Sequence, residues 1–157
     1  MLSGIKFRGE NVGRSLRKAY TEASEPSWEE TGRTFHHQYR PKRFTHAHAT
    51  AAGYGKRKPG YQKRKFRRFG HTYPLVFTGE VRRLVATAHI RARKGTGEVG
   101  NQGGVRVSYP GARKLNLRSK HTNIRMNEEF TRVTDQEATL LGLYFETRFS
   151  MRFSRKG

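Results

Sequence analysis

Residues 31–79 contain no Asp or Glu, and this one-sided charge restricts what the chain can fold into more than any other feature of the sequence. The stretch holds twelve Lys and Arg, five of the seven His and nine aromatic rings. Because like charges repel, such a segment does not condense alone. It needs a polyanion, an acidic protein surface or a folded body to lie on.

The composition of the whole chain indicates one domain with a polyanionic partner. The 157 residues carry a formal net charge of +21, and only 33% are apolar. This length fits a single domain with an appended arm. Clustered Lys and Arg gain free energy by releasing counterions from phosphates, so nucleic acid is a natural partner.

Several classes of protein are excluded by what the sequence lacks. There is no Cys, so disulfides and thiolate zinc sites are ruled out. No window is apolar enough to span a membrane, and the first residues lack the apolar core of a signal peptide. We therefore expect neither export by a signal peptide nor contact with a membrane.

Residues 1–30 are expected to form an N-terminal helix followed by an acidic linker. Apolar side chains at helical spacing from Val12 to Ala23 predict a short amphipathic helix. Pro26 is expected to end it, because proline disfavours helical backbone in the residue before it. The acidic cluster around Glu29 and Glu30 could then fold back onto the basic segment.

Residues 31–72 are predicted to be an extended basic-aromatic arm, because Gly and Pro interrupt them and no periodicity persists. Aromatic rings can stack on bases while Lys and Arg neutralise phosphates. The same surface could instead dock on neighbouring protein subunits, and the composition favours neither interpretation. The predicted nucleic-acid or subunit contacts are Arg40, Lys42, Arg43, Tyr54, Lys56, Arg57, Lys58, Tyr61, Lys63, Arg64, Lys65, Phe66, Arg67 and Arg68.

Residues 73–157 are predicted to form the folded body. A helical turn or two is expected at 80–84. Strands are expected at 85–92 and 104–109, joined by a Gly-rich hairpin loop, and a short strand at 112–117.

The clearest element is the last one. Thr134 and Glu137 match a capping box, and apolar residues at helical spacing follow, which predicts a helix over 135–150. The expected fold class is α+β. A small antiparallel sheet is flanked by an N-terminal and a C-terminal helix, with the long extended basic arm appended.

Candidate catalytic and metal-ligating residues are few. The pairs His36-His37 and His46-x-His48 carry imidazoles that suit zinc, copper or nickel, but they stand in a cationic run that disfavours another cation. The carboxylates between 128 and 137 could hold Mg²⁺ in a nuclease, although helix capping explains them more simply. We therefore expect no enzymatic activity, no cofactor and no metal.

Residues 74–84 read Pro-Leu-Val-Phe-Thr-Gly-Glu-Val-Arg-Arg-Leu. This segment resembles the "P-L-x-x-T-G-x-L-R" element of tail-completion and head–tail joining proteins of long-tailed double-stranded-DNA phages. Those proteins typically continue with antiparallel strands and finish on an amphipathic helix. The element normally ends in Leu-Arg-Arg-Ser, and here Val81 and Leu84 replace Leu and Ser. The segments 112–116, 124–130 and 133–137 are similar to a pattern in uncharacterised phage structural proteins.

The resemblance implies a structural virion protein of the phage neck or tail end that assembles as a homo-oligomeric ring in the host cytoplasm. Its partners would be neighbouring neck, portal-adaptor or tail proteins, with genomic double-stranded DNA as a further contact of the arm. A ring repeats the arm's charge many times, so modest binding per subunit becomes high avidity. The alternative is an RNA-binding ribosomal or ribonucleoprotein component, since small, very basic chains without Cys are common there.

Overall fold

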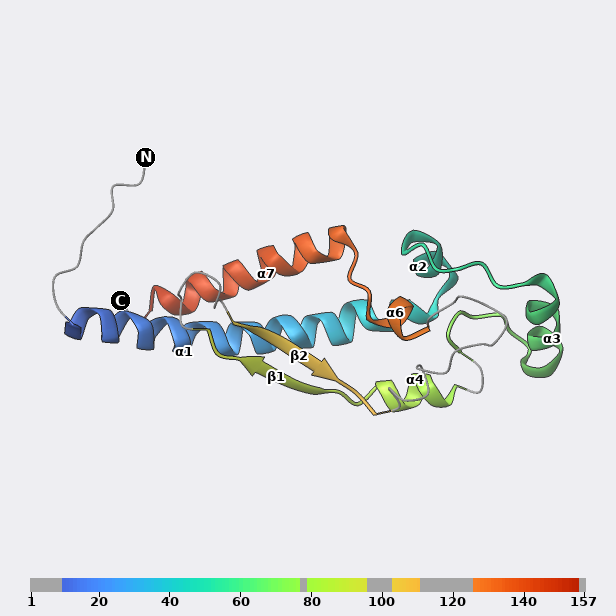
Figure 1. Cartoon of the computed structure of the whole chain (residues 1–157), viewed down its shortest axis with the longest axis horizontal. Helices are drawn as coiled ribbons and strands as arrows, with labels where there is room; N and C mark the ends of the chain where they lie inside the picture. Colours follow the sequence, from blue (N-terminus) through green and yellow to red (C-terminus); the bar gives the residue numbers. More distant parts are fainter. Residues whose placement is uncertain (1–9, 77–78, 96–102, 111–125, 156–157) are drawn as a thin grey trace.

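Figure 1 shows a computed structural model of the chain, in which residues 10–76, 79–95, 103–110 and 126–155 are described. The fold class is α+β, as predicted, with helices flanking a small antiparallel sheet. In chain order the elements are α1 (Glu10–Thr34), the π-helical turn η1 (Phe35–Tyr39), the 3₁₀ helix η2 (Arg40–Phe44), α2 (His46–Ala51), α3 (Pro59–Phe69), α4 (Glu80–Val85), β1 (His89–Arg93), β2 (Gly104–Ser108), α6 (Met126–Thr131) and α7 (Asp135–Phe153).

Helix α1 runs parallel to the long axis of the molecule and packs against α7, β1 and β2, while α2 and α3 lie beyond its C-terminal end (Figure 1). Helix α7 lies antiparallel against one side of it, and the β1–β2 hairpin packs on another. Trp28 of α1 stacks on Phe145 of α7, with ring centroids 3.9 Å apart. Gly32 faces the hairpin, where a Cβ atom would come within 2.6 Å of Val105 Cγ2 and 2.9 Å of Ile90 Cγ2. The missing side chain at Gly32 therefore lets α1 approach the sheet closely.

The sheet consists of β1 and β2, paired antiparallel with His89 opposite Ser108 and Arg93 opposite Gly104. The two predicted strands are confirmed. The first begins later than predicted because α4 is helical as far as Val85. Most of the Gly-rich loop, and the strand predicted at 112–117, lie outside the described residues.

The hydrophobic core is built from η2, α4, α6 and the chain before α4. Its buried members are Phe44, Leu75, Val76, Val85 and Phe130, and the rings of Phe44 and Phe130 are 5.6 Å apart. Partly buried side chains around it are Tyr54, Val81, Tyr109 and Met126. The core thus takes an essential ring, Phe44, from the basic segment.

The predicted helix end at Pro26 is wrong, because α1 continues through it to Thr34. Proline lacks the N–H that would complete the helical ladder, but packing on two sides holds the helix. Glu30 forms ion pairs with Arg148 and Arg152 of α7. The acidic cluster therefore ties α1 to the C-terminal helix and does not cover the basic segment.

The prediction of an extended arm is also wrong, since residues 31–72 are mostly helical. Residues 31–34 complete α1, and η1, η2, α2 and α3 follow. Part of the positive charge is balanced by distant acids, because Arg43 pairs with Glu137 and Arg57 pairs with Glu129. The segment is packed into the fold through these pairs and through Phe44.

The predicted C-terminal helix is confirmed as α7, three residues longer than expected. Its capping box is present, with the Glu137 N–H donating to Thr134 Oγ1 and the Thr134 N–H donating to Glu137 Oε2. None of the described helices combines the length and the apolar character needed to cross a membrane.

Candidate functional site

The predicted contact residues separate into a group that holds the fold together and a group that is available to a partner. The first group is buried or partly buried and comprises Arg40, Arg43, Tyr54, Arg57 and Lys65. The second group is exposed and comprises Lys42, Lys56, Lys58, Tyr61, Lys63, Arg64, Phe66, Arg67 and Arg68. Only the second group can serve as a contact surface without rearrangement of the fold.

Arg43 is fully buried and forms a bidentate pair with Glu137, with Nη1–Oε1 at 2.7 Å and Nη2–Oε2 at 2.8 Å. Its Nη2 also donates to the Arg132 carbonyl at 2.6 Å. Burial alone would raise the pKa of the Glu137 carboxyl. The hydrogen bonds from Arg43 and from the Thr134 N–H outweigh it and keep this pKa below its usual range. Arg43 is therefore a structural residue.

Arg57 and Glu129 form a second bidentate pair, with distances of 2.9 Å and 2.6 Å. Glu129 Oε1 also accepts the Gly55 N–H at 2.8 Å. Glu129 and Glu137, which the sequence offered as possible Mg²⁺ ligands, are thus both engaged by arginines. Across the described part of the chain, no group of three or more His, Asp or Glu is placed to hold a metal ion.

The histidines proposed as metal ligands are also engaged individually. The His36 Nε2–H donates to the Ala86 carbonyl at 2.9 Å. His46 Nε2 is hydrogen-bonded to Thr72 Oγ1 at 3.2 Å, and His48 lies against the Arg43 guanidinium. His36, His46 and His48 therefore each have a structural partner, and the exposed His37 contacts the His36 ring edge-on.

Tyr54 and Lys65 contribute to the fold in the same way. Burial raises the pKa of Tyr54 to about 12, so the phenol stays protonated. Lys65 is 6% exposed and its ammonium donates to the Tyr73 carbonyl at 2.5 Å, which fastens α3 to the chain that follows it. Burial lowers the pKa of this ammonium.

The candidate contact surface is the outward side of α3. Pro59 occupies the first turn, where a missing N–H costs nothing, and Gly70 ends the helix with φ of 71°. All the cations of α3 except Lys65 are exposed, namely Lys63, Arg64, Arg67 and Arg68. Figure 1 places α3 at the end of the molecule away from the hairpin and α7. The helix therefore presents its charge clear of the rest of the fold.

Two aromatic rings accompany these cations. Tyr61 is 36% exposed and Phe66 is 59% exposed. Lys63 and Arg67 are four positions apart, as are Arg64 and Arg68, and like charges at this spacing destabilise a helix. A polyanion would relieve the repulsion and the rings could stack on bases, so the surface fits nucleic acid.

A second exposed surface lies on α7, and the sequence analysis missed it. Leu140, Leu143 and Met151 are 46%, 57% and 49% exposed. They follow a helical stripe on the side of α7 roughly opposite Phe145 and Phe149, which contact α1, and this spacing was the signal that could have revealed it. The exposed positions of α7, all of it described, include Asp135 and Glu146 but no Lys or Arg.

The chain was compared with protein families, curated proteins and solved structures. No protein-family model, no curated protein and no solved structure matches the chain.

Proposed function

We propose that the chain is a structural, non-enzymatic subunit of the neck or tail end of a long-tailed double-stranded-DNA phage. It assembles as a ring through α7 and contacts the genome through α3. The observation that carries the proposal is the pair of exposed surfaces of opposite character, an apolar stripe on α7 and a cationic face on α3. A ring subunit around DNA needs both kinds of surface.

The α7 stripe fits a neighbouring subunit better than any other exposed surface of the described chain. Copies of a chain with net charge +21 repel one another, and they approach at least cost where cations are absent. The exposed positions of α7 come close to that condition, since they carry no Lys or Arg and the partly exposed Arg148 is paired with Glu30. Leu140, Leu143 and Met151 are about half exposed, so covering them there would contribute about 1 kcal/mol for each side chain.

The element at 74–84 supports the resemblance to tail-completion proteins. Leu75 and Val76 lie in the core, and Gly79, with φ of 80°, precedes α4. The antiparallel hairpin and the C-terminal helix follow in the order that those proteins show. The element also fixes the chain on the C-terminal side of α3, so it helps to position the cationic face.

Native mass spectrometry and negative-stain electron microscopy test the ring. The purified protein is expected to form closed rings without nucleic acid. Leu143→Asp should abolish them while leaving the circular dichroism spectrum unchanged. Ala138→Asp is the matched control, because it adds the same charge to an exposed position of α7 away from the stripe, and its rings should persist. A wild-type protein that stays monomeric at all concentrations would refute the proposal.

Binding to duplex DNA at several salt concentrations tests the role of α3. The triple variant Lys63→Gln, Arg64→Gln, Arg67→Gln should flatten the slope of log K against log salt by about 2–3. A matched triple variant of exposed arginines near the hairpin, Arg91→Gln, Arg93→Gln, Arg106→Gln, should leave the slope nearly unchanged. If the two triple variants change the salt slope equally, α3 is not a specific DNA-binding surface.

A second candidate function, an RNA-binding ribonucleoprotein component, is favoured by the exposure of Tyr61 and Phe66. Rings among cations stack on unpaired bases, whereas duplex DNA keeps its bases stacked internally. Phe66→Ala should then weaken binding to single-stranded RNA several-fold and leave duplex DNA binding unchanged. A monomer with that preference would favour this second function over the ring.

A further inference from the structure

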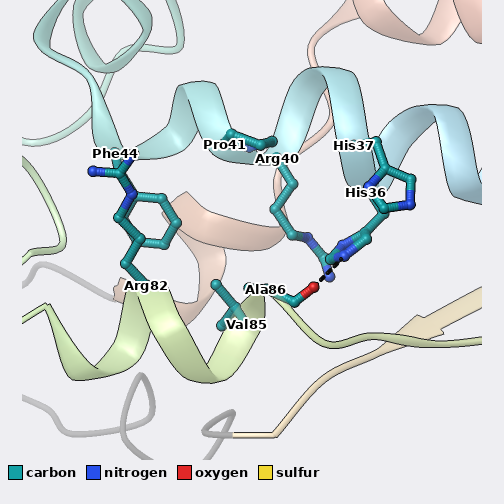
Figure 2. Close-up of a pocket in the computed structure, with 8 residues that line it drawn as sticks. All are labelled: His36, His37, Arg40, Pro41, Phe44, Arg82, Val85 and Ala86. Atoms are coloured by element: carbon teal, nitrogen blue, oxygen red, sulfur yellow. Dashed lines mark hydrogen bonds between the residues drawn. The ribbon is translucent and has the colours of Figure 1, made fainter.

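A cavity of about 270 Å³ lies between the η1–η2 segment and α4, apart from both surfaces described above (Figure 2). Its lining residues are His36, His37, Arg40, Pro41, Phe44, Arg82, Val85 and Ala86. The lining contains two guanidinium groups and two imidazoles but no carboxylate. The chemistry of this wall therefore selects an anion.

Arg40 is the unusual member of the lining. It is 4% exposed, and its Nε and Nη1 atoms have no hydrogen-bond partner within the described residues. Its guanidinium lies over the rings of Tyr109, Phe130 and Phe35, at 4.5, 5.0 and 5.3 Å from their centroids. Ring contacts of this kind stabilise a cation without neutralising it.

A buried cation without a counter-ion is costly, and proteins normally pair one. No ion pair of Arg40 is found in the described part of the chain, although Arg43 and Arg57 both have carboxylate partners. The ranges outside that part contain one acidic side chain, Glu98. Burial also lowers the pKa of Arg40. An anion from outside the chain would supply the counter-charge that the described residues do not give to Arg40.

His36, His37 and Arg82 line the cavity together with Arg40. The His36 Nε2–H donates to the Ala86 carbonyl, so its Nδ1, buried without a partner among the described residues, is an acceptor that can take only the hydroxyl of a protonated phosphate. Arg82 is exposed on α4 and contributes to the opposite wall, where it can move to meet a ligand. Pro41, Phe44 and Val85 add an apolar surface to the same cavity.

We propose that this cavity binds a phosphate group. A phosphate offers more acceptor oxygens than a carboxylate, which suits a wall with two guanidinium groups. The apolar part of the lining leaves room for whatever carries the phosphate. The source is either a small phosphorylated molecule or a backbone phosphate of DNA, and the site does not depend on the proposed phage function.

Thermal unfolding tests the site with inorganic phosphate as the probe, against sodium chloride at equal ionic strength. Saturating phosphate should raise the Tm of the wild-type protein by about 3 °C or more. Arg82→Gln should lose most of this shift. Arg83→Gln is the matched control, because Arg83 is an exposed neighbour on α4 that does not line the cavity, and it should keep the shift.

Arg40→Met provides a second, independent readout. Removing an unpaired buried cation should leave the Tm in phosphate-free buffer equal to or above that of the wild type, and the response to phosphate should be lost. Equal Tm values of the wild-type protein in phosphate and in chloride would overturn the proposal. So would an Arg82→Gln variant that keeps the full shift.

Titration calorimetry identifies the source of the phosphate. If Arg82→Gln weakens binding of inorganic phosphate alone, the ligand is a small phosphorylated molecule. If it also weakens binding of duplex DNA, the ligand is a backbone phosphate. If it weakens neither, relative to Arg83→Gln, the cavity is not a phosphate site.

Discussion

Arg43 and Glu137, 94 positions apart in the sequence, form a buried bidentate ion pair that joins η2 to the first turn of α7. Glu137 also closes the capping box of α7 with Thr134. One carboxylate therefore neutralises a cation of the basic segment and fixes the start of the C-terminal helix. The basic segment and the last helix are held in register by this single side chain.

Glu137→Gln is expected to destabilise the protein by about 3–5 kcal/mol, because it leaves the Arg43 charge buried without its partner. Gln preserves the hydrogen bonds of a capping box, so the loss reports on the ion pair and not on the cap. Urea unfolding followed by circular dichroism measures it. Glu146→Gln, at an exposed position of the same helix, should change the stability by no more than about 0.5 kcal/mol. Equal stabilities for the two variants would contradict this account of Arg43.

Gly32→Ala tests the packing of α1 on the sheet. A Cβ atom would lie 2.6 Å from Val105 Cγ2 and 2.9 Å from Ile90 Cγ2, and branched side chains held in a hairpin cannot turn aside easily. Despite the better helix propensity of Ala, we expect a loss of about 1–2 kcal/mol. Gly13→Ala is the matched control, since no atom lies within 4 Å of its added Cβ, and it should be neutral or stabilising. A gain in stability at Gly32 would show that the hairpin adjusts freely.

The parts of the fold that local sequence could predict are those set by local interactions. The capping box at Thr134 and the helical spacing after it define α7 within a few residues, and the alternation in β2 defines the hairpin. The structure of the basic segment, in contrast, depends on contacts with residues far away in the sequence. The carboxylates that neutralise its arginines, Glu129 and Glu137, lie 72 and 94 positions away in the sequence. The local sequence of the basic segment therefore indicates only repulsion between like charges.

The candidate contact residues also divide into those that the sequence predicts correctly as exposed and those that the fold buries. Lys63, Arg64 and Arg67 are exposed, as a contact residue must be, and no ion pair to them is found among the described residues. Charge alone predicts Arg40 and Lys65 as contacts, but both side chains are buried and so lie outside that surface. Neither the burial of these two side chains nor the cavity around Arg40 can be predicted from the local sequence.

The single Trp of the chain reports on the contact between α1 and α7. Trp28 stacks on Phe145 at 3.9 Å, and Phe145→Leu should remove the ring contact at a cost of about 0.5–1.5 kcal/mol. Water would then reach the indole, so its fluorescence emission should shift to longer wavelength. Leu143→Ala, on the exposed side of α7, should leave the emission unchanged. An unchanged spectrum for Phe145→Leu would mean that the two helices do not pack as described.

Stability should fall as the pH drops below about 6.5, because two histidines resist protonation in the folded protein. Burial, together with nearby arginines, lowers the pKa of His36 and of His48 from the usual value of 6.5. Below that pH these two histidines bind protons more readily in the unfolded chain than in the folded chain, and this difference favours unfolding. Above it both states are neutral at these sites and the effect vanishes.

Urea unfolding between pH 7 and pH 5 measures this dependence, and His36→Gln isolates one of the two groups. Its amide can still donate to the Ala86 carbonyl but does not titrate, so the fall in unfolding free energy should flatten by up to about 1.4 kcal/mol per pH unit. His89→Gln, at an exposed position of β1, is the matched control and should leave the slope unchanged. If His36→Gln unfolds with the wild-type pH dependence, burial is not keeping this imidazole neutral in the folded state.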